Sequence, residues 1–139
     1  MNPLLLDALS RRHAAVEDQA REEWSRKREH SARSARVAQQ LGQAAAAMKS
    51  PSENPLRGVE LSMRRAFGER LQAAADEASL RQKQAEQAEG LGQQRFQAAR
   101  KESLAVQRLR ERQQARLQAA ELKEEQRQLD DFVSARHGR

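Results

Sequence analysis

The chain is interrupted once, by the stretch Lys49-Ser50-Pro51-Ser52-Glu53-Asn54-Pro55-Leu56-Arg57-Gly58. Two of its three prolines lie in this stretch, and the third, Pro3, lies near the N-terminus. The flanking segments contain no proline and consist mostly of Ala, Arg, Glu, Gln and Leu, which lose little side-chain freedom in a helix. We therefore expect an all-α protein with helices over about 3–48 and 59–135 and a turn over about 49–58.

The two expected helices begin with the same three residue types, Asn2-Pro3-Leu4 and Asn54-Pro55-Leu56. Asn is a favoured N-cap, and a proline in the first helical position has no N–H to leave unpaired. Ser50-Pro51 is expected to close the first helix, because the residue before a proline is disfavoured in the α conformation. A connection of about six to ten residues is typical of two antiparallel neighbours.

Small apolar residues recur with heptad spacing along the expected second helix. Steps of four and three residues join Phe67, Leu71, Ala74, Ala78, Arg81, Ala85, Ala88 and Gly92, as in a left-handed coiled coil. The first helix can face this seam with Trp24 near one end and with Val37, Leu41 and Met48 near the other. Folding the chain at about residue 53 places Val37 and Leu41 near Leu71 and Phe67. The prediction is one antiparallel coiled-coil hairpin over residues 1–139.

The second helix is predicted to be the longer one, projecting at its C-terminal end. At 1.5 Å per residue, a first helix of about 45 residues can cover the second only to around residue 105. The uncovered part would hold Leu109, Leu117, Leu122, Leu129, Phe132 and Val133. Exposed apolar residues on a helix are typical of a surface that binds a partner.

The composition favours long helices and limits the possible classes of protein. Leu, Val and Phe supply only 23 of 139 residues and Ile is absent, a level at which disorder is an alternative, but Ala, Glu, Lys, Leu and Arg supply 81. The net charge of +6 comes from acidic and basic residues interspersed throughout, and cysteine is absent. There is no apolar run long enough to span a membrane, and Leu4-Leu5-Leu6 is too short for a signal peptide. A soluble, cytosolic protein is expected.

Residues that could perform catalysis or bind a metal are poorly placed for either. The histidines His13, His30 and His137 lie far apart in the sequence, and the neighbouring Asp130 and Asp131 point to different sides of a helix. The glycines Gly90 and Gly92 lie inside a helical segment, not in a phosphate-binding loop after a strand. We expect no enzyme activity, no cofactor and no metal site.

Two binding functions remain as alternatives on this pattern. The long helix could pair with another copy of itself, as in a generic coiled-coil scaffold. The chain could also bind nucleic acid through its Arg-rich runs, Arg26-Lys27-Arg28 with Arg33 and Arg36, and Arg108 to Arg116. Interspersed acidic residues and the lack of aromatic residues for base stacking disfavour specific nucleic-acid binding.

The C-terminal segment Leu117-Gln118-Ala119-Ala120-Glu121-Leu122-Lys123-Glu124-Glu125-Gln126-Arg127-Gln128-Leu129-Asp130-Asp131-Phe132 resembles the end of the FliJ/YscO/HrpO family of type III export proteins. Members end in a charged helix with a Leu/Met-Asp-Glu-Phe-Ala-like motif and a short basic tail. Here Leu129-Asp130-Asp131-Phe132 matches four positions, with Asp131 for Glu and Val133 for Ala, and Arg136, His137 and Arg139 resemble the tail.

This resemblance implies a function without catalysis. Proteins of that family look like the central stalk of rotary ATPases, a two-helix coiled coil inserted in a hexameric export ATPase. They also contact the export-gate membrane protein, and some escort secretion chaperones. By the match, Leu129, Asp130, Asp131 and Phe132 would face the ATPase, with Leu122 and Val133 beside them. The resemblance implies a cytoplasmic position at the inner-membrane secretion apparatus, flagellar or virulence-associated.

Overall fold

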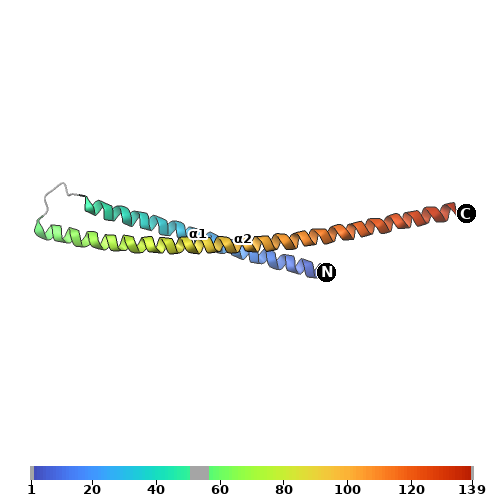
Figure 1. The fold of residues 1–139 in the computed structure, drawn as a ribbon, viewed down its shortest axis with the longest axis horizontal. Helices are drawn as coiled ribbons and strands as arrows, with labels where there is room; N and C mark the ends of the chain where they lie inside the picture. The colour runs from blue at the N-terminus through green and yellow to red at the C-terminus, as the bar shows by residue number, and fades with distance from the viewer. Residues whose placement is uncertain (1, 51–56, 139) are drawn as a thin grey trace. The chain divides into compact units, whose positions relative to one another are not determined.

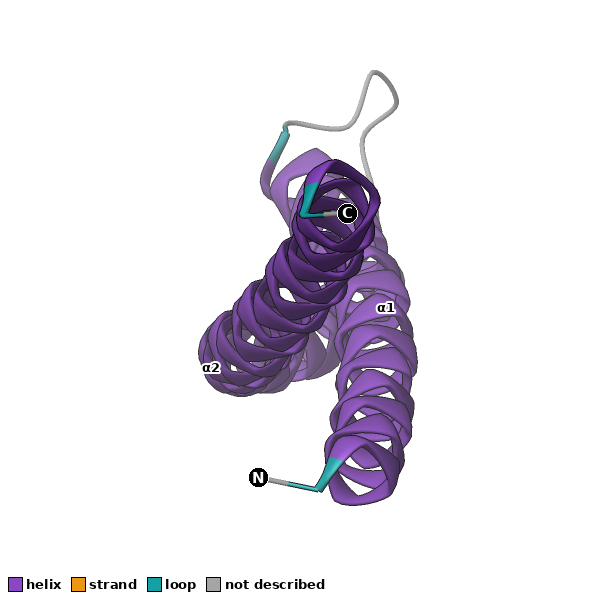
Figure 2. Ribbon diagram, turned by 90° about the vertical axis from the view of Figure 1, so that its right-hand side faces the viewer, coloured by secondary structure: helices purple, strands orange, loops and turns teal. Residues whose placement is uncertain are grey.

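The computed structural model describes residues 2–50 and 57–138, and these residues form two helices and no strand. Helix α1 spans Pro3–Lys49 and helix α2 spans Gly58–His137 (Figures 1 and 2). The all-α helical hairpin expected from the sequence is therefore confirmed, with α2 the longer helix. The predicted N-cap Asn54 and the proline Pro55 lie outside the described residues.

The described helix ends follow from local hydrogen bonding. At the start of α1, the Asn2 side-chain oxygen accepts a hydrogen bond from the Leu4 N–H at 3.0 Å, as expected of an Asn N-cap before Pro3. At the start of α2, the Glu60 carboxylate accepts a hydrogen bond from the Arg57 N–H at 3.3 Å. This is the reciprocal half of a capping box, with Glu three residues after the cap. A glutamate in the first turn also interacts favourably with the helix dipole.

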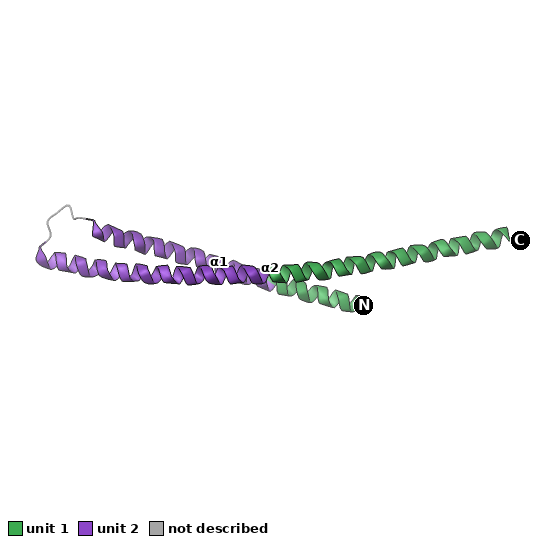
Figure 3. Cartoon of the chain, viewed as in Figure 1, with its two compact units in different colours: residues 1–18, 97–139 green, residues 19–96 purple. Residues whose placement is uncertain are grey.

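The chain divides into two compact units (Figure 3). Unit 2 contains residues 19–96, and unit 1 contains residues 1–18 together with 97–139. In unit 2, the greater part of α1 lies antiparallel to the first half of α2 (Figure 1). In unit 1, the N-terminal turns of α1 pack against the second half of α2.

In unit 2, the packed positions of both helices follow an unbroken heptad pattern. On α1 they are Ala20, Trp24, Lys27, Ser31, Ser34, Ala38, Leu41, Ala45 and Met48, and on α2 they are Leu71, Ala75, Ala78, Gln82, Ala85, Glu89, Gly92 and Phe96. All are buried or half-buried. Most are small, so the helices approach closely but bury little area. Among the described residues, no side chain is fully buried.

This seam shares every second position with the one predicted for α2. The two have Leu71, Ala78, Ala85 and Gly92 in common, but the positions between them lie one residue later in the structure. Phe67 is accordingly 52% exposed, and on α1 Val37 is 48% exposed beside the half-buried Ala38. The apolar pattern alone could not separate Ala74 from Ala75, because both are small and apolar.

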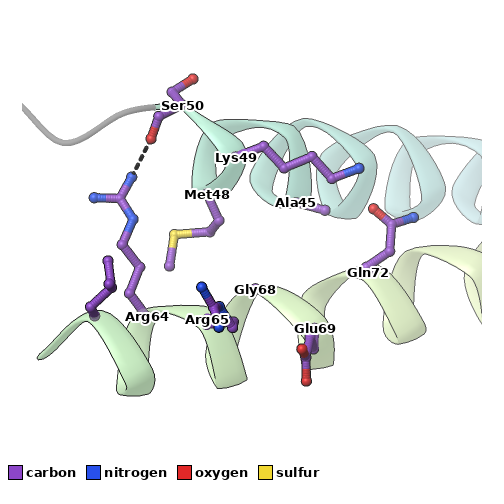
Figure 4. A pocket seen from close by; sticks show the side chains of 10 residues that line it. Ala45, Met48, Lys49, Ser50, Arg64, Arg65, Gly68, Glu69 and Gln72 are labelled. Carbon is purple, nitrogen blue, oxygen red and sulfur yellow. Dashed lines mark hydrogen bonds between the residues drawn. The ribbon is translucent and has the colours of Figure 1, made fainter. Parts of the chain in front are cut away.

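A contact between Met48 and Gly68 sets the pairing near the turn. A Cβ atom added to Gly68 would lie 3.5 Å from the Cβ of Met48, so the two residues face each other directly. Nearby, the Arg64 guanidinium donates a hydrogen bond to the Ser50 carbonyl at 2.7 Å (Figure 4). Because Met48 faces Gly68, the helices pair around position 58. The fold predicted at about residue 53 was therefore wrong by about five residues.

At the other end of unit 2, an aromatic pair joins the helices. Trp24 stacks on Phe96 with ring centroids 5.3 Å apart, and the Arg28 guanidinium lies 4.9 Å from the centre of the Trp24 ring. A Cβ atom on Gly92 would lie 3.5 Å from the Trp24 Cα and 3.1 Å from the Lys27 Cδ. The absence of a side chain at Gly92 therefore lets the α1 backbone come close enough for the stack.

The two glycines near this pair should respond differently to substitution. Gly90→Ala should raise the free energy of unfolding by about 1 kcal/mol, because nothing lies within 4 Å of the added Cβ and alanine has the higher helix propensity. Gly92→Leu should lower it by about 1–3 kcal/mol by pushing the α1 backbone away. Urea denaturation followed by circular dichroism measures both, and equal effects of the two changes would contradict the close approach at Gly92.

Candidate partner-binding surface

The N-terminal turns of α1 pack against α2 in unit 1 through a mainly polar interface. Leu6 is 4% exposed and is the one buried α1 residue among the described part of this unit, while Ala99 is buried on α2. Ion pairs also connect the helices. Asp7 Oδ1 lies 2.9 Å from Arg110 Nε, and His13 Nδ1 lies 3.8 Å from Glu102 Oε2, a pair that is charged only when His13 is protonated.

These contacts correct the predicted limit of coverage at around residue 105. Half-buried Val106 and the Asp7–Arg110 pair show that α1 covers α2 for at least five residues more. Leu6 also lines a small cavity of about 330 Å³ with Leu109, Arg112, Gln113 and Arg116. Within unit 1, the pairing of Asp7 with Arg110 centres at about residue 58, so the start of α1 reaches further along α2 than a fold at residue 53 allows.

Beyond Gln113, every described residue of α2 is exposed. The four apolar residues predicted to bind a partner lie in this free segment. Their exposed fractions are 65% for Leu122, 60% for Leu129, 65% for Phe132 and 50% for Val133. Asp131 is also exposed, and the carboxylate of Asp130 accepts a hydrogen bond from the Gln126 side chain at 3.3 Å. The structure thus places all six predicted partner-binding residues on one uncovered helical segment.

The predicted seam residues occupy several different environments. Ala78 and Ala85 are buried, and Trp24, Leu41, Met48, Leu71, Ala74 and Ala88 are half-buried. Val37, Leu41, Ala74, Ala78, Ala85 and Ala88 also line an apolar groove of about 600 Å³ along unit 2, bordered by His30, Arg33 and Arg81. This groove arises because alanine side chains are too short to fill the space between two helices.

Sequence reasoning missed Phe96 and the contacts around Leu6. Extending the predicted series beyond Gly92 by steps of three and four gives Arg95 and Ala99, so it would have found Ala99 but not Phe96, which lies in the observed series one residue later. The Asp7–Arg110 pair had no comparable signal, because charged residues are abundant on both helices and the pairing centre was misplaced.

The first Arg-rich run is partly engaged within the hairpin. Arg26 lies 3.7 Å from Glu22 on the same helix, Lys27 is half-buried in the seam, and Arg28 lies over Trp24. In the described part of the chain, no group of three or more His, Cys, Asp or Glu residues is arranged to hold a metal ion. Neither helix, over the residues described, is apolar enough along its length to cross a membrane.

Comparison with known proteins gives one match. The sequence profile of the family described as flagellar FliJ protein matches residues 5–139, which include all of α2 and nearly all of α1. No curated protein and no solved structure was found to match the chain.

The unit 1 contacts give a first prediction about this end of the molecule. Leu6→Ala should speed amide hydrogen exchange of residues 3–18 roughly thirtyfold, because removing the buried leucine side chain costs about 2 kcal/mol in a site that can partly collapse. Exchange within residues 19–48 should stay the same. Leu4→Ala, at a position 76% exposed, is the matched control and should change neither segment. Equal exchange in the Leu6 variant and the parent would show that α1 is not held there.

Proposed function

The chain belongs to the flagellar FliJ protein family, whose members are non-enzymatic components of the type III export apparatus, and on this premise we propose that it is the stalk of the export ATPase. In this proposal the free C-terminal segment of α2 enters the hexameric ATPase ring and contacts its subunits. The chain promotes their assembly and activity without performing chemistry itself. It works in the cytoplasm, at the membrane-bound apparatus.

The observation that supports this proposal most directly is the free segment itself. Burying Leu122, Leu129, Phe132 and Val133 against a partner would remove the largest exposed apolar side chains of that segment from water, each worth about 1.5–3 kcal/mol when fully buried. A helix without lateral partners also fits the central opening of a ring, where it can be contacted from several sides. The match of Leu129-Asp130-Asp131-Phe132 to the family's C-terminal motif supports the same segment.

We further propose that the hairpin connects the ATPase with the export-gate membrane protein, with secretion chaperones, or with both. Unit 2 offers a long helical surface for such contacts, including the apolar groove beside Val37 and Leu41. The exposed side chains Val59, Leu61 and Met63 near the start of α2 extend that surface. Co-purification of the gate protein's cytoplasmic domain with the chain, in the absence of the ATPase, tests this part separately.

The assignment of the ATPase-binding segment can be tested with a double variant. Leu129→Asp with Phe132→Ala should abolish co-purification with the export ATPase, and the variant chain should no longer stimulate ATP hydrolysis. The aspartate puts a charge in place of an apolar contact, and the alanine leaves a cavity where the Phe132 ring would pack. Helical content should be unchanged, since both side chains are exposed. Circular dichroism and a pull-down with purified ATPase measure the two quantities.

The matched control applies the same chemical changes elsewhere. Val59→Asp with Met63→Ala alters two side chains of similar exposure, 73% and 69%, at the opposite end of α2. ATPase binding should persist in this control. The assignment fails if the Leu129/Phe132 variant still binds the ATPase as well as the parent does.

A further inference from the structure

Beyond Ala120, the face of α2 that packs against α1 in unit 1 is charged instead of apolar. The α2 positions on that face are Ala99, Ser103, Val106, Arg110 and Gln113, and the series continues at Leu117, Ala120, Glu124, Arg127 and Asp131. A second heptad series, Ala119, Leu122, Gln126, Leu129 and Val133, begins two residues after Leu117. We call it the outer stripe. Two residues correspond to about 200° around a helix, so the outer stripe lies on the far side from the α1 contact.

The outer stripe is therefore more than the uncovered end of the hairpin seam. A continuation of the seam would present its apolar residues in phase with Val106 and Gln113, and of the residues after Gln113 only Leu117 and Ala120 do so before charged residues replace them. Leu122 and Leu129 are out of phase with them and are 65% and 60% exposed. A heptad stripe that is turned away from the chain's own partner helix is the pattern of a second helix–helix interface.

Charge is segregated along the same part of α2. Residues 117–133 contain five acidic and two basic side chains, a net charge of −3 in a chain whose net charge is +6. The preceding residues 100–116 contain six basic and two acidic side chains, a net charge of +4. The segments have equal length and opposite charge, and they adjoin at Leu117.

We propose that the outer stripe pairs with a second copy of this chain in the antiparallel direction, so that residues 117–133 of each copy lie along residues 100–116 of the other. A parallel pair would set like charges side by side over the whole length, whereas the antiparallel pair neutralises both segments. With the two copies crossing near residue 117, Leu129 faces Ala105 of the second copy and Ala119 faces its Ala115. Arg108 of that copy lies opposite Gln126 and beside Glu125. Its Arg112 lies opposite Leu122 and beside Glu121.

The pairing uses the segment that the stalk proposal assigns to the ATPase, so the two bound states exclude each other. In the absence of the ATPase, the second copy of the dimer would cover Leu129 and Val133. Dissociation of the dimer would expose both residues when the ATPase ring is available. The dimer does not require the ATPase assignment to be correct, since it rests on the stripe and the charges of this chain alone.

Sedimentation velocity of the full chain over a concentration series tests the pairing. At about 50 mM salt the chain should sediment as a monomer–dimer equilibrium. Raising salt to about 500 mM should weaken the association by tenfold or more, because the Debye length falls from above 10 Å to a few ångströms. A monomer at every concentration in low salt would overturn the proposal and leave the stripe to a different protein.

A charge exchange between two variants supplies the sharper test. The first variant carries Glu121→Lys, Glu124→Lys and Glu125→Lys, and the second carries Arg108→Glu, Arg112→Glu and Arg116→Glu. Each alone should be monomeric, because like charges then face each other. An equimolar mixture should restore the dimer, because both contact regions of the mixed pair are again complementary.

Helical content of each variant, measured by circular dichroism, shows whether the fold persists. Dimers formed by either variant alone, or no dimer in the mixture of two folded variants, would overturn the antiparallel pairing. Because the ATPase pull-down is a separate measurement, a monomeric parent that still binds the ATPase would refute the dimer and leave the stalk proposal standing.

Discussion

The close approach of two helix backbones at Gly92 determines how the helices of unit 2 pair, and the contact between Met48 and Gly68 belongs to the same register near the turn. At Gly92, the missing side chain on α2 admits Trp24 from α1. Between them the seam is built from alanine and serine, which pack almost equally well in neighbouring registers. The large residues therefore determine the register, and the small residues allow the helices to pack closely in it.

The register in turn decides how much of α2 is left uncovered. Because Met48 faces Gly68, the first turns of α2 extend past the end of α1, with Val59, Leu61, Met63 and Phe67 about half or more exposed. In unit 1, α1 reaches as far as Arg110, and the remainder of α2 is exposed. The register of unit 2 thus sets the exposed start of α2, and the contacts of unit 1 set the length of the segment proposed to enter the ATPase.

The sequence was sufficient for the fold because its strongest signals are local. The prolines near residues 51–55 and the helix-forming residues around them predict two helices and their approximate ends, and the exposed segment around Leu129 follows from the unequal lengths. The exact seam could not be predicted from Ala73-Ala74-Ala75, where three neighbours are alike in size and polarity. It depends on contacts between residues far apart in sequence, such as Met48 with Gly68. The same limitation explains why the Asp7–Arg110 pair was missed.

Trp24, which stacks on Phe96, is an intrinsic fluorescence probe of the contact between the two helices. Trp24 is the sole tryptophan and there is no tyrosine, so nearly all intrinsic fluorescence of the protein originates at this one contact. Its indole N–H is buried and has no hydrogen-bond partner among the described residues, and the half-buried ring stacks on Phe96 with the Arg28 guanidinium 4.9 Å from its centre. Parting of the two helices at this point would admit water to the ring and move its emission to longer wavelength. The state of the hairpin can therefore be followed in solution without attaching any label.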